Sequence, residues 1–107
     1  MTRLAVITGS VRPNRVGSDV ARWVAEKAST VEGVEAEVLE LADFDLPVFA
    51  EEVPPMMAAP KDPASAAWNE ALARFDAYIF VTPEYNRSLP GALKNAIDFI
   101  VPSLLAN

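Results

Sequence analysis

The chain has 107 residues, of which 51% are hydrophobic, and it carries a net charge of −6 with neither cysteine nor histidine. This length and apolar content predict a single domain with a buried core, and they argue against disorder despite nine prolines. The acidic balance disfavours nucleic acid as a partner. The missing residue types exclude disulfides, thiol chemistry and a Ser-His-Asp triad, and they remove the commonest metal ligand.

The N-terminal segment is expected to form a buried strand. Residues 4–7 are a continuous apolar run, which is typical of a strand covered on both faces of a parallel sheet. Gly9 ends this run, so the segment is too short for a signal peptide. Since no apolar stretch approaches the roughly 20 residues of a membrane span, we expect a cytoplasmic protein with no membrane contact.

The next elements are a helix and a second strand. A helix is predicted over residues 18–29, with a partly apolar face of Val20, Val24 and Ala28 and with Trp23 beside it. Residues 34–41 alternate between apolar and polar side chains, and this period of two indicates an edge strand.

A long connection over residues 43–63 holds five of the nine prolines. Its apolar residues predict that it packs on the body of the domain. Loops of this length are often functional, but a structural proline-rich crossover is the preferred interpretation. These apolar residues are Phe44, Leu46, Val48, Phe49, Met56 and Met57.

The remaining elements complete an alternating order. A second helix is predicted from Asp62 as N-cap and Pro63 to residue 74 or 75. A β-branched and aromatic run at residues 78–81 predicts the third strand, and a last helix starts near Pro90 and stops before Pro102. The order β-α-β-α-β-α predicts an α/β fold in which helices cover both faces of a parallel sheet.

The first loop, residues 9–18, has the features of a phosphate site. Its glycines allow close backbone approach, and the helix start supplies N–H groups and partial positive charge. The hydroxyls of Ser10 and Ser18 can donate, and Arg12 and Arg15 can bind phosphate in bidentate fashion. In the alternative interpretation the two arginines are solvated loop charges. The loop matches neither the P-loop nor the dinucleotide fingerprint.

The second loop, residues 83–88, offers the ring of Tyr85, the amide of Asn86 and the cation of Arg87. The alternative is an ordinary βα loop, because Pro, Asn and Ser are common turn residues. In a doubly wound sheet the first and third strands are neighbours, so the two loops would flank one crevice. A phosphate clamp facing an aromatic ring suits a flat mononucleotide cofactor.

Two motifs together resemble the NADPH-dependent FMN reductase family, which includes quinone, azo-dye and chromate reductases. They are Gly9-Ser10-x-Arg12 and, over residues 83–98, Pro-Glu-Tyr-Asn-x-Ser-x-Pro-Gly-x-Leu-Lys-Asn-x-x-Asp. The resemblance covers residues 1–107 as one domain. It implies a flavodoxin-like three-layer sandwich with strand order 2-1-3, with FMN as cofactor and NADPH or NADH as co-substrate.

The resemblance also implies roles for individual residues, with no catalytic side chain and no metal. Ser88 is expected to steady its turn, and Lys94, Asn95 and Asp98 are expected to serve in helix capping and dimer packing rather than catalysis. By resemblance, the FMN phosphate is bound by Ser10, Arg12, Arg15, Ser18 and the backbone N–H groups of Val16 and Gly17. The isoalloxazine ring is contacted by Pro83, Glu84, Tyr85 and Asn86.

Members of this family continue beyond this length with two more strands, two more helices and a glycine-rich loop. We therefore expect a C-terminally incomplete domain whose apolar third strand is a poorly protected edge. Such a chain is expected to self-associate, as a dimer or tetramer, or to be loosely packed and prone to aggregation.

The leading hypothesis for function is a reductase that passes hydride from NAD(P)H through FMN to a quinone, flavin or other small acceptor. Cofactor chemistry suits a chain without histidine or cysteine, because the cofactor carries the reactive atoms. One alternative is a flavin-binding electron carrier like flavodoxin, although flavodoxins typically lack the two arginines of the first loop. The other alternative is an inactive fragment that merely dimerises.

Overall fold

In the computed structural model, which describes residues 1–105, three parallel strands form one sheet in the order β2-β1-β3. The central strand β1 (Thr2–Thr8) pairs along its whole length with β2 (Val34–Glu40). On its other side, β3 (Ala77–Val81) pairs with residues 4–8. The predicted α/β class and strand order are confirmed.

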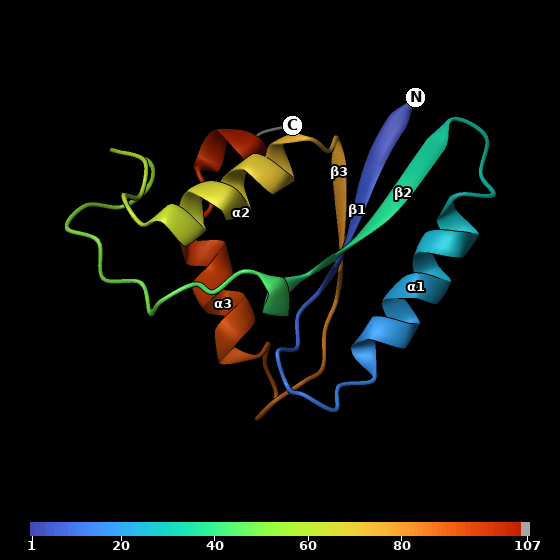
Figure 1. Ribbon diagram of the computed structural model, residues 1–107, viewed down its shortest axis with the longest axis horizontal. Helices are drawn as coiled ribbons and strands as arrows, with labels where there is room; N and C mark the ends of the chain where they lie inside the picture. The colour runs from blue at the N-terminus through green and yellow to red at the C-terminus, as the bar shows by residue number, and fades with distance from the viewer. Residues whose placement is uncertain (106–107) are drawn as a thin grey trace.

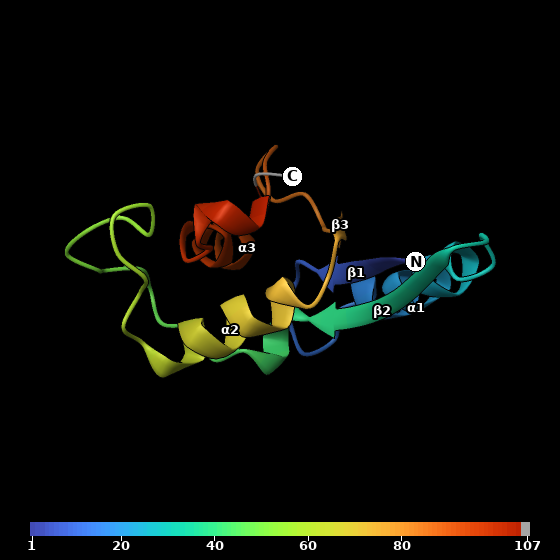
Figure 2. The ribbon, with the colours of Figure 1, turned by 90° about the horizontal axis from the view of Figure 1, so that it is seen from above.

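Helices cover both faces of this sheet (Figures 1 and 2). α1 (Gly17–Ala28) lies on one face, whereas α2 (Pro63–Ala73) and α3 (Gly91–Asp98) lie on the other. The predicted start of α2 is confirmed, because the Asp62 carboxylate accepts the N–H of Ala64 at 2.8 Å. No helix within residues 1–105 is both long enough and apolar enough to cross a membrane.

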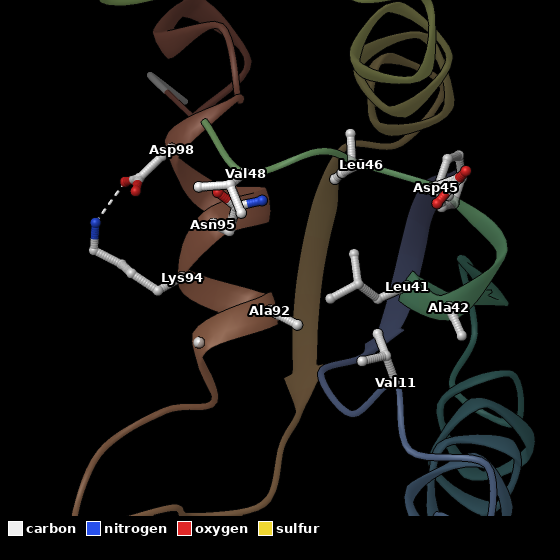
Figure 3. Close-up of a pocket in the computed structure, with 12 residues that line it drawn as sticks. Val11, Leu41, Ala42, Asp45, Leu46, Val48, Ala92, Lys94, Asn95 and Asp98 are labelled. Carbon is white, nitrogen blue, oxygen red and sulfur yellow. Dashed lines mark hydrogen bonds and ion pairs between the residues drawn. The ribbon is translucent and has the colours of Figure 1, made fainter. Parts of the chain in front are cut away.

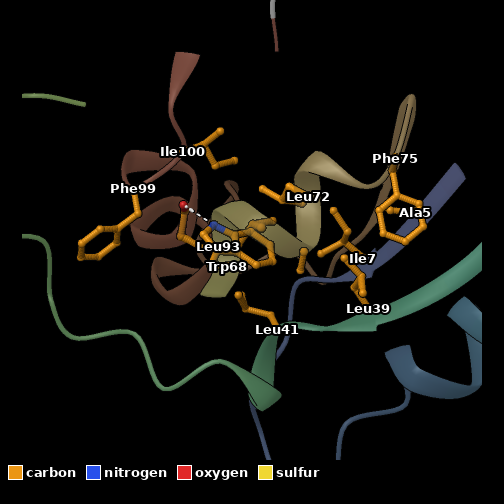
Figure 4. Packing of buried hydrophobic residues seen from close by; sticks show 12 residues of the cluster. Ala5, Ile7, Leu39, Leu41, Trp68, Leu72, Phe75, Leu93, Phe99 and Ile100 are labelled. Carbon is orange, nitrogen blue, oxygen red and sulfur yellow. Dashed lines mark hydrogen bonds between the residues drawn. The ribbon is translucent and has the colours of Figure 1, made fainter. Parts of the chain in front are cut away.

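The larger part of the core lies between the sheet and the α2/α3 layer (Figure 4). Trp68 is fully buried, and its indole N–H donates to the carbonyl oxygen of Ala96 at 3.0 Å, which joins α2 to α3. The Asn69 amide adds a second link, since it donates to the carbonyl of Phe99 at 3.0 Å and accepts the N–H of Val101 at 2.9 Å. The larger core therefore fixes the position of α3, which follows the second loop.

The α1 face is smaller and corrects part of the sequence prediction. Ala21 and Ala25 are the buried residues of α1, whereas Val20 and Trp23 are 46% and 60% exposed. Val24 and Ala28 of the predicted face pack against this part of the core, so the prediction is confirmed for them and wrong for Val20 and Trp23. The physical reason is that two alanines one turn apart let the helix approach the sheet closely, and the bulkier neighbours then turn outward.

The connection after β2 begins with a short 3-10 helix, η1 (Leu41–Asp43), and then runs away from the sheet and back (Figures 1 and 2). Phe44 packs on the core as predicted, with its ring 5.1 Å from that of Trp68. The prediction is wrong for Val48, Met56 and Met57, which are 84%, 76% and 71% exposed. Only part of the connection therefore belongs to the core.

Asn95 fastens this connection to α3. Its side-chain amide donates to the carbonyl oxygen of Pro47 at 2.7 Å, and its carbonyl oxygen accepts the N–H of Phe49 at 2.8 Å. Helix capping, one of the two roles expected for Asn95, is therefore wrong, and dimer packing stays a prediction. Its side chain, in the middle of α3, instead supplies hydrogen bonds to the irregular backbone of the connection around residues 47–49.

Candidate functional site

The two loops meet at the carboxyl edge of the sheet. The N–H of Gly9, directly after β1, donates to the carbonyl of Val81 at the end of β3 at 2.8 Å. A Cβ on Gly9 would lie 2.9 Å from Leu93 Cδ2 and 3.0 Å from Thr82 Cβ. Any residue larger than glycine would force Leu93 or Thr82 to shift, so the exit of β1 packs directly on the segment that leads from β3 into α3. The two loops therefore start at the same edge of the sheet, as expected, and the crevice expected between them stays a prediction.

Side-chain hydrogen bonds hold the first loop in shape. The buried hydroxyl of Ser10 accepts the backbone N–H of Arg12 at 3.3 Å. Arg15 Nη1 donates to the backbone carbonyl of Arg12 at 2.9 Å. The Arg12 side chain is itself exposed and has no ion pair with any of residues 1–105. One arginine of the loop is therefore used internally, and the other faces solvent.

The start of α1 lies at the end of this loop and offers backbone donors. Val16 is the N-cap, and no side chain caps the first turn. The first N–H groups of a helix have no acceptor within the helix, which leaves those of Gly17 and Ser18 as donors at its positive end. Together with the Arg12 cation, these groups match what a phosphate monoester requires.

Arg15 and Ser18, two of the predicted phosphate contacts, face Glu40 at the end of β2. Arg15 Nε donates to Glu40 Oε1 at 3.3 Å, and Thr8 Oγ1 donates to the same oxygen at 2.8 Å. Burial raises the pKa of Glu40, but hydrogen bonds from Ser18, Thr8 and Arg15 and the Arg15 charge outweigh it. The pKa of Glu40 therefore lies below its usual value of 4.5. Sequence analysis did not single out Glu40.

The second loop contains a tight hairpin turn. The N–H of Tyr85 donates to the carbonyl of Ser88 at 2.9 Å, and the N–H of Ser88 donates back at 3.1 Å. Between them, Asn86 and Arg87 have φ angles of 50° and 68°. Two left-handed residues in succession are typical of a two-residue hairpin. Ser88 steadies this turn through its backbone, as expected.

Tyr85 brings the second loop onto the first. A hydrogen bond with Ser10 and the nearby Arg12 lower the pKa of the Tyr85 phenol from its usual 10.0, although burial opposes them. The Tyr85 side chain is 37% exposed, so its ring lies at the surface beside the proposed anion donors. Glu84 and Asn86 are also exposed, and Pro83 is half-buried.

A pocket of about 650 Å³ lies on the α3 side of the first loop (Figure 3). It is lined by Val11 of the first loop, by Leu41 of η1 and by Ala92 of α3, and the Lys94–Asp98 ion pair lies on the α3 side of it. Its lining is mainly apolar. Within residues 1–105 no group of carboxylates is arranged to hold a metal ion.

The sequence profile of NADPH-dependent FMN reductases matches residues 2–107. The chain belongs to this family. An NAD(P)H-dependent FMN reductase from Nectria sp is 43% identical over 106 residues, covering 94% of this chain and 53% of that relative. A quinone reductase from Pseudomonas putida is 41% identical over 95 residues, covering 89% and 47%. The family resemblance inferred from the two motifs is confirmed.

Solved structures agree with this assignment. The flavoenzyme NAD(P)H:(acceptor) oxidoreductase FerB from Paracoccus denitrificans matches with a TM-score of 0.67 at 31% identity, covering 92% of this chain and 50% of that one. An NADH:FMN oxidoreductase in its apo form matches with a TM-score of 0.72 at 20% identity, covering 99% and 54%, and supports the flavodoxin-like fold. The chain spans about half the length of these relatives.

Proposed function

We propose that this chain is an FMN-binding domain of an NAD(P)H-dependent reductase that passes hydride to a quinone, flavin or other small acceptor. The observation that carries the proposal is the meeting of the two loops. There, the exposed Arg12 cation lies beside Tyr85, and the uncapped start of α1 ends the same loop that carries Arg12. A cation and backbone donors suit a phosphate, and an exposed ring suits a flat heterocycle.

Each loop has a separate part in binding. The chemistry that bound FMN supplies is hydride transfer between NADPH or NADH and the acceptor, so no side chain is assigned as a catalytic residue. The first loop would hold the phosphate, with Arg12 and the helix-start amides as direct donors. Of the six predicted phosphate residues, Arg12 and the backbone N–H groups of Val16, Gly17 and Ser18 would contact the phosphate, whereas Ser10 and Arg15 would hold the loop in shape. The proposed ring contacts are Pro83, Glu84, Tyr85 and Asn86.

The visible spectrum and a coupled assay test this function. After incubation with FMN and gel filtration, the purified chain should show flavin absorption bands, and it should oxidise NADPH when a quinone is added. Flavin bands without NADPH oxidation would instead favour an electron carrier. A protein that retains no flavin and oxidises no NADPH would contradict the proposal. The cytoplasmic location and the preference between NADPH and NADH stay predictions.

We also propose that the chain forms a homo-oligomer, a dimer or tetramer, through β3 and the α3 side. Among residues 1–105, β3 pairs with β1 alone, and Ile79 on this strand is 40% exposed. Near α3, Met56 lines an apolar hollow with Ile97 and Ile100. An unpaired strand edge and exposed apolar side chains are each typical of an association site. Sedimentation should show a species larger than the monomer, and Met56→Glu should reduce its mass; a strictly monomeric wild type with a cooperative melt would contradict this.

A further inference from the structure

We infer that Glu40 is a positioning residue that sets the shape of the first loop for phosphate binding. This inference rests on the proposed FMN site. Glu40 is the last residue of β2 and pairs in register with Thr8, the last residue of β1. The carboxylate therefore lies beside the point where the central strand ends and the first loop begins.

A buried hydroxyl fixes the orientation of this carboxylate. Thr8 is fully buried, its Oγ1 donates to Glu40 Oε1 at 2.8 Å, and the same Oγ1 accepts the N–H of Leu41 at 3.3 Å. The hydroxyl thus uses its one donor and one of its acceptor sites. Because a buried polar group is costly to leave unpaired, this arrangement holds the carboxylate in one position.

From that position Glu40 holds the first loop through Arg15. Arg15 Nε donates to Glu40 Oε1 at 3.3 Å, and Arg15 Nη1 donates to the backbone carbonyl of Arg12 at 2.9 Å. The Ser18 hydroxyl, in the first turn of α1, lies near enough to Glu40 to lower the pKa of its carboxyl. One carboxylate therefore links both strand ends to the backbone of the residue proposed to bind phosphate, and it lies near the helix start that supplies the amide donors.

This role predicts a change in FMN affinity opposite in direction to the change that charge repulsion alone would cause. A carboxylate close to a phosphate repels it, so Coulomb's law alone predicts tighter FMN binding once the carboxylate is neutralised. If Glu40 positions the loop, neutralising it loosens Arg15 and with it the backbone at Arg12, and binding weakens. The direction of the change distinguishes the two effects.

The variant Glu40→Gln keeps the size of the side chain and an acceptor for Thr8, but it removes the charge that holds Arg15. We expect its FMN affinity, measured by quenching of flavin fluorescence, to fall about tenfold, the scale of one hydrogen bond to a charged group. Affinity for riboflavin, which lacks the phosphate, should not change. Glu37→Gln makes the same charge change at an exposed position of the same strand and should alter neither affinity.

Equal or tighter FMN binding by Glu40→Gln would overturn the inference, and so would an equal loss for both flavins, which indicates general destabilisation. If the wild type binds neither flavin, the proposed function fails, and hydrogen exchange of the free protein decides the inference. Glu40→Gln should then speed amide exchange at residues 11, 12 and 14–16 and leave β1 unchanged. Unchanged exchange in the loop would overturn the role of Glu40.

Discussion

The first loop and the second loop lie side by side at the carboxyl edge of the sheet, but different interactions hold them. Side chains fix the first loop, because Ser10 and Arg15 bond to the backbone of Arg12 and Arg15 also pairs with Glu40. Backbone hydrogen bonds fix the second loop, as a two-residue hairpin between Tyr85 and Ser88.

This difference determines what each loop can offer a ligand. The first loop uses its side chains internally, so the groups it presents are backbone amides and one cation, held in fixed geometry. The second loop uses its backbone internally, so the groups it presents are exposed side chains that can adjust to a ring. A rigid anion site beside an adaptable aromatic surface is consistent with a cofactor that has a phosphate at one end and a flat ring at the other.

The largest expected effect is the loss of the cation in the first loop. Arg12→Ala should weaken FMN binding by about 1.5–3 kcal/mol, the scale of a hydrogen bond to a charged group. Riboflavin affinity should be unchanged, because riboflavin has no phosphate for Arg12 to bind. Fluorescence titration of both flavins measures this, and equal FMN affinity in a folded variant would remove Arg12 from the site.

The next largest effect is a loss of stability at Gly9, where the first loop packs against the start of the second. Gly9→Ala places a Cβ 2.9–3.0 Å from Leu93 and Thr82, and such overpacking should lower the free energy of unfolding by about 1–2 kcal/mol. Gly17→Ala is the matched control, because a Cβ there meets nothing within 4 Å. Urea titration of both variants gives the comparison. Equal stability of the two would mean that the loops are not in tight contact at Gly9.

A smaller effect is expected from the exposed ring of the second loop. Tyr85→Ala should cost about 0.5–1.5 kcal/mol of FMN affinity beyond the lost area, the scale of an aromatic contact. Tyr85→Phe keeps the ring and removes only the hydroxyl, so it should retain most of the affinity. If both variants lose affinity equally in the flavin titration, the hydroxyl rather than the ring is the contact.

The smallest effect concerns the hairpin backbone. Arg87 has a φ of 68°, a conformation that glycine adopts without the steric cost that other residues carry. Arg87→Gly should therefore raise the free energy of unfolding by about 0.5 kcal/mol, after the entropic cost of glycine is subtracted. A thermal melt measures the change. A clear loss of stability would show that the Arg87 side chain, and not only the backbone, supports the turn.

Sequence patterns predicted the elements that depend on local physics. The apolar run of β1, the Asp62 cap of α2 and the alternating edge strand β2 each follow from a few adjacent residues. The place where the two loops meet followed from the order of elements, because parallel strands all end at the same edge of a sheet.

Features that depend on register and distance were not predictable in this way. The Arg15–Glu40 pair requires the pairing of β1 with β2, and no local pattern specifies that register. A weak signal existed, since Glu35 and Glu37 alternate and Glu40 breaks the alternation at the strand end. The sequence also did not predict the hairpin between Tyr85 and Ser88, because Asn86-Arg87 lacks the glycine that usually marks such a turn.

NMR titration of the ¹⁵N-labelled chain with FMN tests most directly whether FMN binds between the two loops. Saturable shifts should appear at the amides of residues 10–12, 14–18 and 84–88, while the amide signals of Asp45 and Val48, which line the pocket in Figure 3, should not shift. Shifts confined to that pocket, or no saturable shifts at all, would contradict the proposed site.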